Sequence, residues 1–166
     1  MLKIINELKP FFEDCYRDIN VRGYARIQKI SAPTASTVLK KYSSEGLLKY
    51  EEDKGYLLFR ANRESAILRD LSKIYWRMKL KDLIDYLDDL NVKFVILFGS
   101  ISKLENNKLS DIDLFISSNK MINVKHYENI LKRKIQIFSY KNINDIKNKE
   151  LKNNILNGHI LLGRLE

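Results

Sequence analysis

Two aspartates, Asp111 and Asp113, lie one residue apart in the stretch "SDIDLFISS", ten residues after the pair Gly99-Ser100. Because side chains alternate along a β-strand, both carboxylates of a strand that begins here would point to the same face. Like charges this close repel each other unless a cation lies between them. Mg²⁺ prefers oxygen ligands and often binds through one or two carboxylates together with substrate phosphates. The aspartate pair therefore predicts a magnesium site.

The Gly-Ser pair ends the run "VKFVILFGS", residues 92–100, whose apolar part is typical of a buried strand. Glycine lets the backbone approach a phosphate closely. The Ser100 hydroxyl and nearby backbone N–H groups can donate hydrogen bonds to phosphate oxygens. We therefore expect a turn that binds phosphates beside a carboxylate pair that holds the metal ion.

This pattern, "GS", ten residues and then "DID" within "SDIDL", resembles the minimal nucleotidyltransferases of the DNA polymerase β superfamily. The resemblance covers residues 80–163. It implies transfer of a nucleotidyl group from a nucleoside triphosphate to a hydroxyl, with Mg²⁺ held by Asp111 and Asp113 as catalytic residues. The acceptor would be a protein hydroxyl, as in family members that modify toxin partners, or a nucleic-acid end.

The chain departs from the family pattern in the loop and on a later strand. The family often has Ala-Arg-Gly where this chain has Ser102, Lys103 and Leu104. Lys103 keeps a positive charge near the phosphates but lacks the bidentate fork of arginine, and it joins Gly99 and Ser100 as a candidate nucleotide-binding residue.

The larger departure concerns the third carboxylate of the family, which the resemblance aligns with Gln136 in "KIQIFSY". No acidic residue occurs from 129 to 144, and Glu128 and Asp145 would have to reach in from helices. A glutamine can lend an amide oxygen to a metal but cannot take a proton. Loss of a positioned base costs ~10²–10⁴ in rate, so we expect nucleotide–Mg²⁺ binding to survive better than catalysis.

The first sixty residues predict helices near the N-terminus, at about 22–29 and at 34–45, followed by a hairpin through Asp53-Lys54-Gly55. The stretch "APTASTVLKKYSSEGLLKY" resembles the recognition helix and first wing strand of winged helix-turn-helix domains, whose second motif helix enters the DNA major groove. The resemblance makes DNA-binding candidates of Thr34, Ser36, Thr37, Lys40, Lys41 and Lys54. A role in protein interaction or dimerisation, or a purely structural role, stays open.

Together these patterns predict an α+β protein: a winged helix-turn-helix at 1–63, a connector helix at 64–90, and a small nucleotidyltransferase-type α/β domain with a mixed sheet at 91–166. In the connector, Tyr75 and Trp76 are expected in the core or at an interface. The apolar positions of its amphipathic pattern are Ile67, Leu71, Ile74, Met78, Leu83, Leu87 and Leu90. Two functions follow. The chain is an Mg²⁺-dependent nucleotidyltransferase, or it is a catalytically impaired homologue acting as a DNA-binding regulator or antitoxin-type partner.

Composition narrows the setting of this 166-residue chain. No apolar run is long enough for a membrane span, and the single cysteine excludes an internal disulfide and favours the reducing cytoplasm. With two histidines and one cysteine, the composition argues against a dedicated zinc site. The net charge of +9 favours a polyanionic partner or substrate. Winged helices and long connector helices also favour a homodimer.

Overall fold

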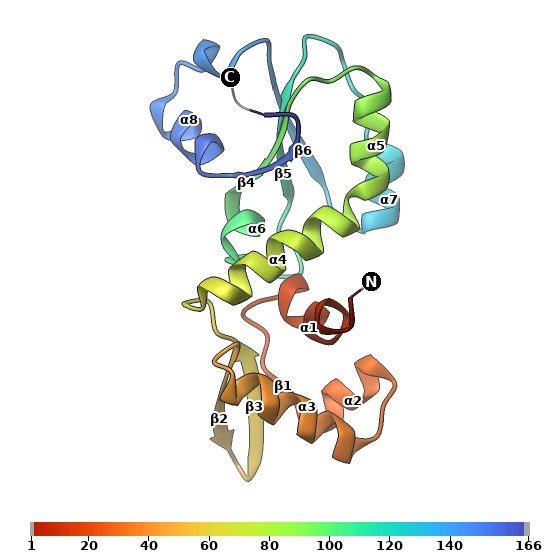
Figure 1. The fold of residues 1–166 in the computed structure, drawn as a ribbon, viewed down its shortest axis with the longest axis vertical. Coiled ribbons are helices and arrows are strands. Elements are labelled where there is room, and N and C mark those ends of the chain that lie inside the picture. The colour runs from red at the N-terminus through yellow and green to blue at the C-terminus, as the bar shows by residue number, and fades with distance from the viewer. Residues whose placement is uncertain (1, 165–166) are drawn as a thin grey trace. The chain divides into compact units, whose positions relative to one another are not determined.

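The computed structural model describes residues 2–164 and divides into two units, each treated by itself (Figure 1). Unit 1 takes the chain up to Tyr75 together with Leu104–Lys108. Unit 2 takes Trp76–Lys103 and the chain from Leu109 onward. The chain therefore leaves unit 2 for five residues between the Gly-Ser pair and the aspartates, and then returns to it.

Unit 1 contains three complete helices, the first part of a fourth, and a three-stranded antiparallel sheet of order β1-β3-β2. Its elements in chain order are α1 (Lys3–Glu13), β1 (Ile19–Asn20), α2 (Val21–Gln28), α3 (Ala32–Ser44), β2 (Leu48–Asp53), β3 (Tyr56–Ala61) and the first part of α4 (Ala66–Lys79). The order of three helices and then a hairpin agrees with the sequence analysis. The assignment as a winged helix stays a prediction.

Local signals explain where α2 and α3 begin and end. Asn20 caps α2 by accepting a hydrogen bond from the Gly23 backbone N–H at 2.7 Å. The helix stops at Lys29, which adopts the left-handed conformation at φ 56°. Ser31 then caps α3 by accepting from the Thr34 N–H at 3.3 Å. A three-residue turn, 29–31, therefore joins the two helices.

The hairpin between β2 and β3 turns at Lys54-Gly55, where φ is 50° and 79°. Two positive φ values in a two-residue loop are typical of a type I′ turn, whose twist matches that of the flanking strands. The turn pairs Asp53 with Tyr56 and places the exposed side chain of Lys54 at the tip of the hairpin.

The loop Leu104–Lys108 is fixed to the C-terminal end of α1. The Asn106 side-chain amide donates to the carbonyls of Phe12 at 2.9 Å and Glu13 at 3.1 Å, which the helix itself leaves unpaired. In return, the backbone N–H of Cys15 donates to the Asn106 carbonyl at 3.0 Å. Asn106 has no exposed surface. This loop is therefore an interior part of unit 1.

The segment predicted as one connector helix forms two helices, α4 and α5 (Lys81–Asp89), with Leu80 between them at φ −90° and ψ 4°. Of the predicted apolar positions, Leu83 and Leu87 of α5 are buried, but Ile67 and Ile74 of α4 are 64% and 42% exposed. Tyr75 and Trp76 are buried, as predicted. Aromatic rings bury more apolar area than isoleucine, so the helix is rotated by about one residue to cover them.

Unit 2 is built on a mixed four-stranded sheet of order β6-β5-β4-β7. β4 (Val95–Phe98) is antiparallel to β5 (Ile112–Ser117) and to β7 (His159–Leu162), and β5 is parallel to β6 (Ile135–Tyr140). A mixed sheet was predicted. The strand expected from Asp111 begins one residue later, at Ile112.

Helices lie on both sides of this sheet (Figure 1). α8 (Lys149–Leu156) covers one face, where Phe94, Phe115 and Ile155 form part of an apolar cluster. α5 and α7 (Lys125–Leu131) lie on the other side, with the rings of Tyr86 and Tyr127 5.4 Å apart. The short helix α6 (Gly99–Lys103) follows β4 directly.

Residues 142–157, whose pattern predicts one continuous helix, do not form one. A 3-10 turn, η1 (Ile143–Asp145), comes first, and Asn148 then caps α8 by accepting from the Leu151 N–H at 3.0 Å. Asparagine side chains compete for backbone hydrogen bonds and so favour caps over helix interiors.

In the part of the chain that the structure describes, no helix has the length and apolar character needed to cross a bilayer.

Candidate nucleotidyltransferase site

Sheet register brings the sequence-predicted residues of unit 2 to one end of the sheet. In β5, Asp113 pairs with Phe98 of antiparallel β4 on one side and with Gln136 of parallel β6 on the other. Gly99 follows Phe98 immediately. Because each strand presents alternate residues to a given face, Asp113 and Gln136 share the face that carries Phe115.

Gly99 and Asp113 are in direct contact. Gly99 has φ 71°, a conformation that L side chains rarely adopt. A Cβ added to Gly99 would overlap Oδ2 of Asp113 and lie 3.2 Å from its Cγ. The missing side chain is therefore the space into which the Asp113 carboxylate fits, and no other residue type can occupy this position without moving that carboxylate.

The surroundings of Asp113 disfavour a negative charge on its carboxyl group. Burial raises the pKa of the Asp113 carboxyl, and the negative charge of Asp111 raises it further. The Asp111 carboxylate is thus close enough to disfavour the ionised form of Asp113. Such a pair is stabilised by a cation, and two carboxylates with a neighbouring amide oxygen form an oxygen donor set that suits Mg²⁺.

Gln136 touches the site through Asp111. Its amide Nε2 donates to Oδ2 of Asp111 at 2.7 Å. A carboxylate at position 136 would repel Asp111, whereas the amide supplies a hydrogen-bond donor to it. Among residues 2–164, no group of three or more His, Cys, Asp and Glu side chains could hold a metal ion.

The two flanking acids are engaged elsewhere. Glu128 Oε1 accepts from the backbone N–H of Ile135 at 2.9 Å. Asp145 belongs to η1, beyond the far end of β6, where its Oδ2 accepts from the Asn142 N–H at 3.0 Å. Gln136 lies at the start of β6, so a strand of about 3.3 Å per residue separates it from Asp145.

The remaining phosphate-binding candidates lie in α6. Ser100 is its second residue and is partly buried. The Lys103 ammonium donates to Asn154 Oδ1 of α8 at 3.0 Å. The Ser102 hydroxyl donates to the Gly99 carbonyl at 2.9 Å and so fixes the turn that carries Gly99.

Sequence reasoning missed Arg133, which lies between two lysines in a basic part of the sequence. Arg133 is only 8% exposed and lies 5.3 Å from the Trp76 ring centre. Its guanidinium donates to the Ser110 carbonyl at 2.6 Å, directly before Asp111. A planar guanidinium can stack on a ring and donate at once, which lysine cannot do. Nothing in the run "KRK" distinguishes the buried arginine from its exposed neighbours.

The DNA-binding candidates lie in unit 1, on α3 and at the hairpin tip. Thr34, Thr37, Lys40 and Lys41 are exposed, and Ser36 is partly buried. Two of the hydroxyls already have local partners. Thr34 Oγ1 lies 2.7 Å from Ser31 Oγ, and the Thr37 hydroxyl donates to the Pro33 carbonyl at 3.1 Å.

The chain matches the polymerase beta nucleotidyltransferase family over residues 81–166, which is more than half of its length. The match starts at the first residue of α5 and spans the sheet with its Gly-Ser and aspartate motifs. The chain therefore belongs to this family. Comparisons with curated proteins and with solved structures give no match.

Substituting Gly99 tests the contact with Asp113. Gly99→Ala should destabilise the protein more than Gly46→Ala, because both glycines have φ near 70° but nothing lies within 4 Å of a Cβ at Gly46. The control therefore measures the backbone strain alone, which is about 1–2 kcal/mol. Free energies of unfolding in urea provide the comparison. Equal losses in the two variants would contradict the contact.

The raised pKa of Asp113 predicts a pH-dependent gain of stability in Asp113→Asn. When the folded pKa lies above the unfolded one, the ionised group destabilises the folded state, and the favourable contribution present at acid pH is lost as pH rises through the folded pKa. Without metal, Asp113→Asn should therefore raise the free energy of unfolding at pH 7, and the gain should vanish at acid pH.

Urea unfolding from pH 3 to pH 8 in the presence of a chelator measures this effect, with Asp88→Asn on exposed Asp88 as control. A gain that is the same at every pH, or a loss at pH 7, would show that the charge of Asp113 is not the cause.

Proposed function

We propose that this protein is an Mg²⁺-dependent nucleotidyltransferase that transfers a nucleoside monophosphate from a nucleoside triphosphate to a hydroxyl of a protein or nucleic acid. The observation that carries the proposal is the fit of the Asp113 carboxylate into the space left by Gly99, with Asp111 beside it. This arrangement joins the phosphate-binding turn and the carboxylate pair in one place. Family membership supports the same reaction class.

Asp111 and Asp113 would hold the metal ion, and the amide oxygen of Gln136 is the next available oxygen ligand. When bound, Mg²⁺ would neutralise charge on the transferring phosphate. The backbone at Gly99 and the hydroxyl of Ser100 would bind phosphate oxygens, and Lys103 would add a positive charge. The Asn154 contact places the Lys103 ammonium between α6 and α8.

The weak point of the site is proton removal. In the transfer, the acceptor oxygen bonds to the α-phosphorus, pyrophosphate leaves, and the hydroxyl proton must go to a base. Gln136 cannot take it, and Glu128 and Asp145 are hydrogen-bonded elsewhere. Turnover is therefore slow in this proposal, while nucleotide binding is retained.

Restoring the acid should raise the transfer rate. Gln136→Asp should increase label transfer from a radiolabelled nucleoside triphosphate at least about 10-fold in Mg²⁺, because a positioned base contributes ~10²–10⁴. Gln136→Asn, of the same size without the charge, should give no increase, and Asp113→Ala should abolish transfer. Candidate acceptors are a protein hydroxyl and a nucleic-acid end. Transfer that is absent in wild type and in Gln136→Asp alike would reject the enzyme.

The replacement of an acid by Gln136 also favours a second candidate, in which the chain is a catalytically impaired homologue that acts as a DNA-binding regulator or as an antitoxin-type partner protein. Residues 32–61, α3 with the hairpin, hold five basic and four acidic residues. Glu51, Glu52 and Asp53 are exposed on β2 beside Lys54. Phosphates are repelled by this strand, so DNA would be contacted through α3.

Lys40→Ala with Lys41→Ala should therefore weaken DNA binding and lower its dependence on salt concentration, because each phosphate contact releases a counterion. Lys54→Ala should have a smaller effect. Gel-shift titrations at several salt concentrations measure both. If the double variant binds as the wild type does, α3 is not the DNA contact and the protein-partner role is favoured.

A further inference from the structure

Unit 2 has a concavity at the end of its sheet that is opposite to Gly99 and Asp113. It has a volume of about 350 Å³. Residues at the start of β4 and just after β6 and β7 line it, together with Ser117, the last residue of β5. Along β5, residues of one face run in the order Asp113, Phe115 and Ser117, so buried Phe115 separates the two places.

Among the residues that the structure describes, three cationic side chains and no carboxylate line this concavity. They are Lys93 before β4, Lys141 after β6 and Arg164 after β7. The strand order places β6 and β7 at opposite edges of the sheet with β4 between, so the cations are spread across its whole width. Within residues 2–164, none of the three forms an ion pair with a carboxylate.

Contacts to backbone carbonyls fix the segments that carry these cations. The Ser117 hydroxyl donates to the Lys141 carbonyl at 2.9 Å. Gly163, at φ 74°, approaches the Lys93 carbonyl so closely that a Cβ could not fit between them. That glycine therefore brings the segment carrying Arg164 against Lys93. Neither contact is needed to hold the aspartate pair at the other end of the sheet.

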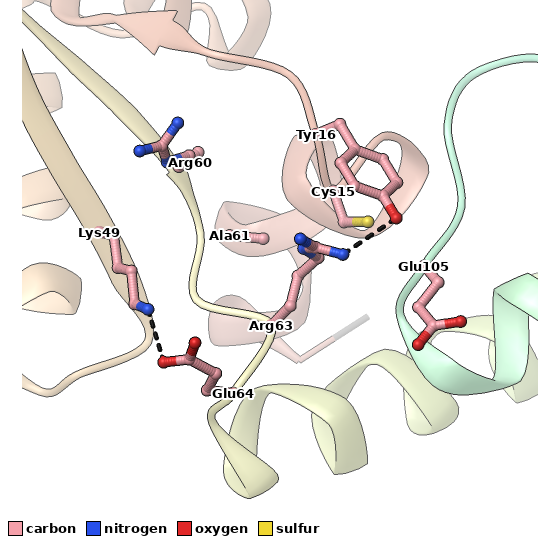
Figure 2. Close-up of a pocket in the computed structure, with 8 residues that line it drawn as sticks. All are labelled: Cys15, Tyr16, Lys49, Arg60, Ala61, Arg63, Glu64 and Glu105. Atoms are coloured by element: carbon pink, nitrogen blue, oxygen red, sulfur yellow. Dashed lines mark hydrogen bonds and ion pairs between the residues drawn. The ribbon is translucent and has the colours of Figure 1, made fainter.

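A pocket in unit 1 is also lined by cations, but these cations have partners within the protein (Figure 2). Its volume is about 470 Å³, and Lys49, Arg60 and Arg63 line it together with Glu64 and Glu105. Each of these cations already has a partner. Lys49 pairs with Glu64 at 2.6 Å, Arg60 with Glu51 at 2.8 Å, and Arg63 donates to the Tyr16 hydroxyl at 2.9 Å. An anion would have to displace these partners, whereas the concavity of unit 2 requires no such exchange.

The floor of the unit 2 concavity is apolar. Phe94 and Phe115 pack edge to face with ring centres 6.1 Å apart, and Ile143 of η1 packs against the same cluster. A bare inorganic anion would leave this floor uncovered. Small-molecule sites combine an apolar lining with a few polar groups in a volume of about 300–1,000 Å³.

We propose that this concavity is a second ligand site, which binds a phosphorylated small molecule with a planar or apolar body, the size of a nucleoside monophosphate. Its phosphate contacts the cations, with the Arg164 guanidinium suited to bidentate contact. Its body covers Phe94 and Ile143. This site does not rest on the proposed transfer reaction, because it uses none of the residues of that reaction.

The test uses the full-length protein in the presence of a chelator and follows AMP binding by calorimetry. AMP should bind saturably with one site per chain. Adenosine and inorganic phosphate, which each lack one half of the ligand, should bind at least about 10-fold more weakly, as expected for loss of charge-assisted hydrogen bonds or of apolar contact. Phosphate binding as tight as AMP binding, or no saturable AMP binding in the millimolar range, would overturn the proposal.

Matched variants locate the binding. Lys141→Ala with Arg164→Ala should weaken AMP binding about 10-fold or more. Lys125→Ala with Lys149→Ala removes the same charge from exposed positions outside the concavity and should leave AMP affinity unchanged. Asp113→Ala should leave it unchanged as well. Loss of AMP binding in Asp113→Ala but not in the Lys141/Arg164 variant would place AMP at the aspartate site and reject the second site.

Discussion

The site of unit 2 depends on one steric constraint, the fit of the Asp113 carboxylate against the bare Cα of Gly99. The positive φ of Gly99 turns the chain out of β4, and the antiparallel pairing of Phe98 with Asp113 places the carboxylate in the space that results. Neither feature alone defines the site. A side chain at 99 or a one-residue shift of register would separate the Gly-Ser turn from the carboxylates.

This fit has an electrostatic cost, and Gln136 reduces it. Burial and the charge of Asp111 both disfavour the ionised form of Asp113. Without a metal ion, the negative charge of Asp113 therefore destabilises the site. A third carboxylate on the neighbouring strand would add to the repulsion, whereas the Gln136 amide donates to Asp111. The amide at position 136 therefore makes the metal-free site more stable, and in the proposed reaction it would leave the acceptor hydroxyl without a base to take its proton. Stability and activity would then be opposed at this residue, as they often are at functional sites.

Features of the fold that depend on local sequence patterns could be predicted from the sequence. The strand-turn-aspartate spacing, the hairpin at Lys54-Gly55 and the three N-terminal helices could all be predicted. Features set by packing between distant segments could not. The burial of Tyr75 and Trp76 could be predicted, but the exposure of Ile67 and Ile74 on the same helix could not, because it depends on what packs against α4. The role of Arg133 depends on a ring and a carbonyl far away in the sequence, and an exposed lysine run looks the same.

The loop between the Gly-Ser pair and the aspartates shows how packing can replace a residue type. Where the family often has glycine, Leu104 adopts φ 58°, a conformation that costs a non-glycine residue about 1–2 kcal/mol. Leu104 has no exposed surface, and burying a leucine side chain contributes about 1.5–3 kcal/mol. The Cys15 thiol also donates to the Leu104 carbonyl at 3.1 Å. Burial thus offsets the strain, so the left-handed turn at Leu104 forms without glycine.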